Sequence, residues 1–188
     1  MSTARISTPS LPPSPTVLVL VDFINPLDFD GADALAPPAL AAARATATLR
    51  RRVARDGVQT IYANDNYGVW RSDFKAVWAR CRALRGAPAE IARLLQPRRA
   101  DLTILKPRHS AFYSTPLDLL LRQLRCKKLI VAGLAADNCV LFTAMDAYLR
   151  GYSLWVPQDC VAAETAEGKA GALEHMRRIL KATVRPSA

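Results

Sequence analysis

Short runs of aliphatic and β-branched residues alternate along the chain with longer stretches in which apolar positions recur at helical spacing. The short runs predict strands at residues 17–21, 58–63, 102–105, 128–132 and 153–156. The longer stretches predict helices at residues 38–55, 73–85, 87–95, 116–125, 138–150 and about 164–181. Strands that alternate with helices in this order are typical of successive βαβ units.

Two of the predicted strands are apolar at every position, because 17–21 reads Val-Leu-Val-Leu-Val and 129–132 reads Leu-Ile-Val-Ala. A strand with one solvated face alternates apolar and polar residues, whereas a strand covered on both faces does not. We therefore expect an α/β fold of three layers, in which helices cover both faces of a doubly wound, mainly parallel sheet. Ligands bind such sheets beyond the carboxyl ends of the strands.

The 188 residues fit one domain, which we place at residues 16–188. Residues 1–15 hold six Ser or Thr and four Pro without the apolar core of a signal peptide, so we expect a flexible N-terminal tail there. The apolar run at 17–21 is far shorter than the roughly 20 residues that cross a bilayer. We therefore expect a cytoplasmic protein with no membrane partner.

The chain is basic, with 26 Lys and Arg against 16 Asp and Glu, a net charge of +10. Such a charge is compatible with a nucleic-acid partner, and three consecutive arginines stand at 50–52. That run falls inside the predicted helix 38–55, on a face that we expect to be largely solvated, and the chain carries no recognised nucleic-acid motif. We therefore expect no nucleic-acid partner.

Four cysteines are present, with no C-x-x-C pair and no histidines clustered beside them: Cys81, Cys126, Cys139 and Cys160. This spacing argues against a zinc site and against a disulfide framework, so we expect four free thiols. We expect Cys81, Cys126 and Cys160 to be structural.

Reactive side chains follow three of the predicted strands. Asp22 ends the first strand, Lys106 ends the third, and Cys139 opens the helix after the fourth. Each could be ordinary when taken alone, as a turn residue, a solvated lysine or a small buried hydrophobe. All three share one edge of a parallel sheet, which predicts a site. The helix N-terminus should also lower the pKa of the Cys139 thiol.

Three motifs carry a resemblance to a known family. They are Leu-Val-Leu-Val-Asp at 18–22, Lys-Pro-Arg-His-Ser-Ala-Phe at 106–112, and Gly-Leu-Ala-Ala-Asp-Asn-Cys-Val at 133–140 followed by Thr-Ala-Met-Asp-Ala at 143–147. In this order the motifs resemble the isochorismatase-like cysteine hydrolase superfamily. The resemblance implies a Rossmann-like sheet and a catalytic Asp–Lys–Cys triad of Asp22, Lys106 and Cys139. It also implies a cis peptide at Leu134–Ala135.

The resemblance implies a hydrolase that cleaves a C–N bond of a small amide, ureido or carbamoyl compound. Cys139 would attack the carbonyl carbon, Asp22 would move the proton, and the backbone N–H groups of Ala135 and Cys139 would form the oxyanion hole. The alternative is hydrolysis of the vinyl ether of isochorismate with Asp22 as the acid. That reaction does not need the thiol, so the presence of Cys139 favours the amidohydrolase. The resemblance also implies a homo-oligomer, either a dimer or a tetramer.

Some relatives, the nicotinamidases, hold a metal through a D-x-H motif after the second strand and a later histidine. Here Asp65 stands in that region without an imidazole, since the segment reads Asn-Asp-Asn-Tyr-Gly and both histidines, His109 and His175, lie elsewhere. A lone carboxylate is a poor transition-metal site, so we expect no metal and no cofactor.

Motif order also places candidate substrate-binding residues near the triad. They are the aromatic Phe23, Trp70, Phe112 and Tyr113, the polar Asn25, Arg71 and Arg108, and Ala136, where many relatives have Thr or Ser. The two arginines would suit a substrate carboxylate, or they would contact solvent or a second subunit. Trp70 could form a substrate wall or a half-buried anchor.

Overall fold

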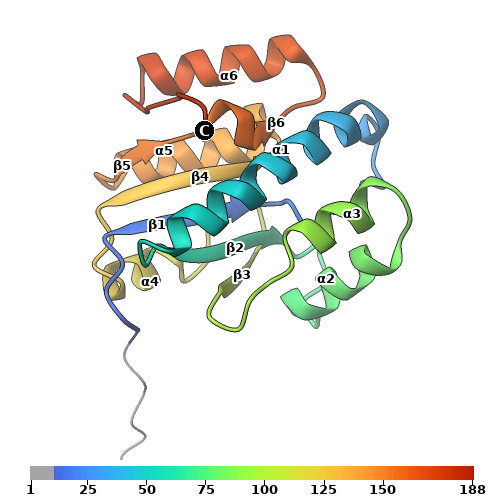
Figure 1. Ribbon diagram of the computed structural model, residues 1–188, viewed down its shortest axis with the longest axis horizontal. Coiled ribbons are helices and arrows are strands. Elements are labelled where there is room, and N and C mark those ends of the chain that lie inside the picture. The colour runs from blue at the N-terminus through green and yellow to red at the C-terminus, as the bar shows by residue number, and fades with distance from the viewer. Residues whose placement is uncertain (1–10) are drawn as a thin grey trace, which may run out of the picture.

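A computed structural model describes residues 11–188. Its centre is a parallel sheet with the strand order β3-β2-β1-β4-β5, and a short sixth strand pairs with β4 (Figure 1). The strands are β1 (Thr16–Val21), β2 (Gln59–Asp65), β3 (Leu102–Lys106), β4 (Lys128–Leu134), β5 (Ser153–Trp155) and β6 (Val161–Ala162). All five expected strands are confirmed. The two-residue β6 was not predicted, because so short a segment has no readable period.

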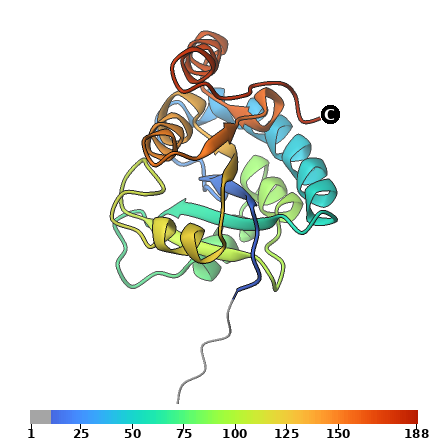
Figure 2. The ribbon, with the colours of Figure 1, turned by 90° about the vertical axis from the view of Figure 1, so that its left-hand side faces the viewer.

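Helices cover both faces of the sheet. α1 (Ala32–Ala54), α2 (Phe74–Ala83) and α3 (Ala87–Leu94) pack on one face, and α4 (Leu117–Gln123), α5 (Leu141–Leu149) and α6 (Ala166–Arg178) pack on the other. In Figure 2 the cyan α1 lies to one side of the sheet and the yellow and orange α4 and α5 lie to the other. The expected three-layer, doubly wound α/β fold is confirmed.

The central strand β1 shows why its sequence is apolar throughout. Val17, Val19 and Val21 pack into the core against α4, α5 and α6, while Leu18 and Leu20 pack into the core against α1 and α3. All five side chains are fully buried. Each burial stabilises the fold by roughly 1.5–3 kcal/mol before conformational entropy is counted. A polar residue at any of these positions would have no solvated face to turn to.

Two predicted elements differ from the structure. The first helix begins at Ala32 and not at residue 38, so Pro37 and Pro38 lie inside α1. The helix tolerates them because the carbonyls that lose a hydrogen bond belong to Asp33 and Ala34, which are exposed at its start. The helix expected at 138–150 begins instead as a π-helical turn, Ala136–Val140, which continues into α5.

The arginine run at 50–52 is not a wholly solvated face. Arg51 and Arg52 are exposed, but Arg50 is buried and pairs with the equally buried Asp101. Arg50 also donates to the carbonyl of Gln96 and lies over the ring of Tyr62. The expectation of a solvated face was wrong for Arg50 because its guanidinium ties α1 to the segment between α3 and β3. One charge of the run is therefore structural.

The tail expected at residues 1–15 falls largely on residues 1–10, which lie outside the described residues. Within residues 11–15, Ser14 is buried and its backbone N–H donates to the carbonyl of Leu124 at 2.7 Å. The carbonyl of Pro15 accepts from Lys127 and Lys128. No helix in residues 11–188 is long and apolar enough to cross a membrane.

Gly133 lets β1 and β4 approach each other next to Asp22. Its φ is +147°, and a Cβ atom there would stand 2.1 Å from the carbonyl oxygen of Val21. Residues that carry a side chain rarely adopt this backbone conformation. The neighbouring backbone of Val21 cannot move away without breaking the hydrogen bonds between β1 and β4. The close approach therefore requires glycine.

Gly133→Ala should destabilise the protein by about 3 kcal/mol or more, because the added methyl meets backbone. Gly57→Ala is the matched control, since Gly57 also has a positive φ of +72° but faces open space. It should lose only about 1–2 kcal/mol of backbone strain. Urea unfolding of the two variants measures the difference. Equal losses would show that the clash with Val21 is relieved at no cost.

Candidate active site

Asp22 lies directly after β1 in a strained backbone conformation. Its φ is +49°, in the left-handed region, which costs a non-glycine residue about 1 kcal/mol. The Asp22 N–H donates to the carbonyl of Ala63 at 3.0 Å, and the carboxylate Oδ1 accepts the N–H of Asp65 at 2.7 Å. The end of β2 therefore holds both the backbone and the side chain of Asp22 in place.

Lys106 is the last residue of β3 and is fully buried. Its ammonium Nζ lies 2.7 Å from Asp22 Oδ2 and donates to the carbonyl of Arg108 at 3.1 Å. The same Nζ lies 3.6 Å from Cys139 Sγ and 3.8 Å from Asp65 Oδ2. One buried cation thus contacts two carboxylates, a carbonyl and a thiol.

Cys139 lies in the π-helical turn between β4 and α5. The carbonyl of Ala135 accepts the N–H groups of Asn138 and Val140, each at 3.1 Å, and so fixes the turn on both sides of the cysteine. The peptide bond between Leu134 and Ala135 is cis. Cys139 is half-buried, whereas the other three free cysteines are buried.

These three side chains meet because of the strand order. β1 and β4 are neighbours although two strands separate them in sequence, so the order reverses between them. Asp22 follows β1 and the Cys139 turn follows β4, which places both groups at this switch point, the usual position of ligand sites in such sheets. The structure brings Asp22, Lys106 and Cys139 together as the sequence predicts.

Burial and neighbouring charges set the protonation states. Burial raises the pKa of Asp22, although the Lys106 ammonium partly opposes this shift. Burial would lower the pKa of Lys106, but the charge and hydrogen bond of Asp22, with the charges of Cys139 and Asp65, together outweigh burial and raise that pKa. Burial and the charge of Asp22 raise the pKa of the Cys139 thiol to about 12.

The expectation that the helix N-terminus would lower the thiol pKa was therefore wrong. The site excludes water and holds a carboxylate beside the sulfur, and both effects disfavour the thiolate. At neutral pH the resting group is a thiol next to a buried ion pair.

Comparisons with known proteins agree with this geometry. A family profile described as "Isochorismatase domain" matches residues 16–186. The chain is 37% identical over 167 residues to YaaI of Bacillus subtilis (strain 168), described as an uncharacterized isochorismatase family protein, and the match covers 89% of this chain and 91% of YaaI. The chain belongs to the isochorismatase family. It is therefore an isochorismatase-family hydrolase.

Two solved structures are similar to the chain over most of its length. One is N-carbamoylsarcosine amidase from Thermoplasma acidophilum, with a TM-score of 0.71, 28% identity and coverage of 92% of this chain and 96% of that one. The other is pyrazinamidase/nicotinamidase from Streptococcus mutans UA159, with a TM-score of 0.70, 27% identity and coverage of 90% and 99%. Both proteins are named as amidases.

The metal of the nicotinamidase branch does not fit the residues present. Asp65 is the carboxylate at the end of β2, and its oxygens accept the N–H of Tyr67 and face Lys106. A cation would have to compete with that ammonium. Within residues 11–188 no three His, Cys, Asp or Glu side chains are grouped so that they could hold a metal ion.

Two residues at the site were missed as contacts in the sequence analysis. His109 Nδ1 lies 3.6 Å from Cys139 Sγ, and its ring stacks on that of Phe142 at 5.5 Å. Asp65 was considered only as an isolated carboxylate, yet it supports Asp22 through its N–H and Lys106 through its carboxylate. Asp65 is the last residue of β2 and His109 stands three residues after β3, so their positions at the carboxyl ends of strands are the signal that could have identified them.

The predicted substrate-binding residues are divided between core and surface. Phe23, Phe112 and Ala136 are buried, and Asn25 is half-buried with its side chain accepting the N–H of Leu27. The others are exposed: Trp70, Arg71, Arg108 and Tyr113. Phe23 has no surface to offer a substrate, because it is fully buried in the core cluster with α1. Arg108 approaches the triad through its carbonyl.

Asp22→Asn should lower the pKa of the Cys139 thiol below about 12, because the neighbouring anion disappears. Lys106→Ala should raise it, because the neighbouring cation disappears. The pH dependence of alkylation by iodoacetamide measures both shifts, and the other three cysteines are buried. Asp28→Asn is the control, since Asp28 is exposed on the surface beside Arg80. An unchanged pKa in Asp22→Asn would contradict the assigned electrostatics.

Proposed function

We propose that this hydrolase cleaves a C–N bond of a small amide, ureido or carbamoyl compound through a cysteine thioester. The observation that carries the proposal is the position of Lys106, whose Nζ lies 2.7 Å from Asp22 Oδ2 and 3.6 Å from Cys139 Sγ. A base, a nucleophile and the cation that orients both are thereby within contact distance. Amidases among the similar structures support the same chemistry.

The first half of the reaction forms the thioester. Asp22 accepts the thiol proton while Cys139 Sγ attacks the carbonyl carbon, because a thiol with a pKa of about 12 is not ionised beforehand. The raised pKa of Asp22 makes its carboxylate a stronger base than an exposed one. The proton then passes from Asp22 to the leaving nitrogen as the C–N bond breaks.

Backbone donors would stabilise the tetrahedral intermediate between these steps. We assign this role to the N–H groups of Ala135 and Cys139, which belong to the turn that the Ala135 carbonyl fixes. The loss of one such donor typically costs about two to three powers of ten in rate. In the second half, Asp22 takes a proton from water as the water oxygen attacks the thioester carbonyl. The C–S bond then breaks, the proton passes from Asp22 to the Cys139 sulfur, and the acid product leaves.

A cavity of about 190 Å³ follows the end of β2, and Asp22, Lys106 and Cys139 do not line it. Its lining is Pro26, Asn66, Tyr67, Val69, Ser72, Ala76, Val77, Arg80 and Cys81. Drug-sized ligands occupy roughly 300–1,000 Å³, so this cavity fits a smaller molecule. Trp70 and Arg71 lie on the same loop and are exposed, which would let them close over a substrate.

We also propose a homo-oligomer and no nucleic-acid partner. The apolar side chains Phe142, Met145 and Leu149 are exposed on α5, at the i, i+3 and i+7 spacing of one helix face. An exposed apolar face of this kind is stabilised when a second copy of the chain covers it and removes it from water. Sedimentation of the purified protein measures its mass.

Replacing the nucleophile separates the two chemistries of the family. Cys139→Ala should lower kcat/KM on the best amide by several powers of ten, because no covalent path remains. Vinyl-ether hydrolysis with Asp22 as the acid would lose little in this variant. A value within about tenfold of wild type, or about 1.4 kcal/mol, would reject the thioester and favour the isochorismatase alternative.

Variants of the two possible bases complete this experiment. Asp22→Asn should be as damaging as Cys139→Ala, and the double variant should be hardly worse than either, because the two residues act as a unit. His109→Gln should keep most of the activity. A loss equal to that of Asp22→Asn would move the role of the base to His109, which also contacts the sulfur.

Turnover should survive exhaustive treatment with EDTA, because Asp65 faces Lys106 and has no imidazole beside it. Elemental analysis of the active protein should find no stoichiometric zinc, iron or manganese. Loss of activity on chelation that is restored by added zinc would contradict this prediction.

A further inference from the structure

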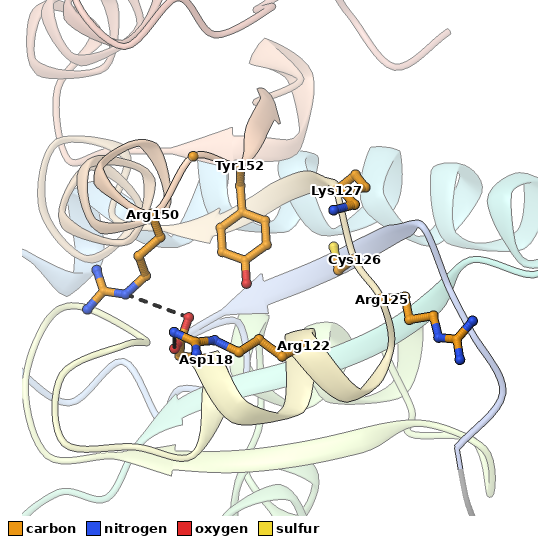
Figure 3. Close-up of a pocket in the computed structure, with 8 residues that line it drawn as sticks. Asp118, Arg122, Arg125, Cys126, Lys127, Arg150 and Tyr152 are labelled. Atoms are coloured by element: carbon orange, nitrogen blue, oxygen red, sulfur yellow. Dashed lines mark ion pairs between the residues drawn. The ribbon is translucent and has the colours of Figure 1, made fainter.

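A second cavity lies at the other end of the sheet. Its volume is about 610 Å³, and its walls come from α4, from the segment 125–127 that leads into β4, and from the residues 150–152 between α5 and β5 (Figure 3). These segments mark the amino ends of the strands, whereas Asp22, Lys106 and Cys139 follow the carboxyl ends. The cavity is therefore separate from the triad.

The cavity is strongly cationic. Four basic side chains line it, Arg122, Arg125, Lys127 and Arg150, against the single carboxylate of Asp118. Asp118 pairs with Arg122 at 2.7 Å and lies 3.9 Å from Arg150. The closer partner of Arg150 is Asp146 on α5, at 2.5 Å, which does not line the cavity. Arg125 and Lys127 take part in no ion pair within residues 11–188.

An aromatic ring and a neutral thiol complete the lining. The Tyr152 ring stacks on Phe112 at 6.2 Å between centroids, and Figure 3 shows its hydroxyl directed toward Asp118 and Arg122. Burial raises the pKa of the Cys126 thiol to about 11, so it adds no negative charge near pH 7. The cavity thus combines a flat apolar surface with an excess of positive charge.

We infer that this cavity binds a phosphorylated small molecule of about the size of a nucleoside monophosphate. A phosphate ester carries a charge of about −1.5 to −2 near pH 7, which matches the excess of cations better than a single carboxylate does. Arginine presents a planar fork of donors that pairs with phosphate through two hydrogen bonds. The volume lies within the range of about 300–1,000 Å³ for small-molecule sites, and Tyr152 offers a surface for a ring.

The shape of the site favours a small molecule over a nucleic-acid polymer. The basic groups surround a concavity that also contains Tyr152, whereas backbone binding to a duplex needs cations spread along an exposed stripe.

Isothermal titration with adenosine 5′-monophosphate at physiological salt tests the inference. We expect binding with a Kd below about 1 mM, and at least about tenfold weaker binding of inorganic phosphate, which lacks a ring. Arg125→Ala and Lys127→Ala should each weaken the nucleotide by about tenfold or more, and both side chains are exposed, so the fold should tolerate them. Arg99→Ala removes the same charge from an exposed loop outside this cavity and should leave binding unchanged.

Three results would overturn the inference. The first is that neither the nucleotide nor phosphate binds measurably at 5 mM, a concentration roughly five times the highest expected Kd. The second is an equal loss of affinity in Arg99→Ala, which would indicate attraction by net charge alone. The third is tight binding of duplex DNA that the nucleotide does not compete for and that Arg125→Ala and Arg99→Ala weaken equally, which would make the basic surface a nucleic-acid face.

Discussion

The buried ion pair between Lys106 and Asp22 is the interaction on which the site depends. A lysine with no exposed surface is stable as a cation only if anions and carbonyls replace the water that it loses, and Asp22, Asp65 and the carbonyl of Arg108 do so. Loss of one partner from such a pair typically costs about 3–5 kcal/mol, because the other charge remains buried. Asp22 in turn needs its left-handed backbone and the N–H of Asp65 to face the ammonium. The catalytic geometry and the stability of this edge therefore have a common cause.

The loop after β3 and the helix after β4 are joined as one unit by hydrogen bonds. Ser110 donates to Asp146 on α5 at 2.5 Å, and the N–H of Ala111 donates to Thr143 Oγ1 at 3.0 Å. The loop also provides the carbonyl of Arg108 that contacts Lys106, while α5 continues from the turn that holds Cys139. The distance between ammonium and thiol is thus set by contacts outside the triad. This explains why the motif at 143–147 accompanies the cysteine in the sequence.

The sequence predicted well the part of the fold in which strands are buried on both faces. A wholly apolar run such as residues 17–21 is stable only as a central strand with helices on both faces. The order of the strands then places Asp22, Lys106 and Cys139 at one edge of the sheet. Contacts that depend on loop paths were not predictable in this way. His109 reaches the sulfur because the loop after β3 turns back toward α5, and Arg50 is buried because a carboxylate from beyond α3 meets it. Neither partner has a fixed spacing along the chain.

The pKa of the Cys139 thiol could not be predicted from the sequence pattern, for a different reason. A helix start is a local feature of sequence and favours a thiolate, but burial and the charge of Asp22 are tertiary features and act in the opposite direction. Burial and this charge raise the pKa of the thiol to about 12, so the proposed mechanism needs proton transfer during the attack and no preformed anion. The same reasoning applies to the net charge of +10, which no single surface explains. Arg50 is part of the core, Lys106 is part of the triad, and Arg122, Arg125, Lys127 and Arg150 gather around one cavity. Because the charges are divided among these environments, their sum predicts a partner less well than their positions do.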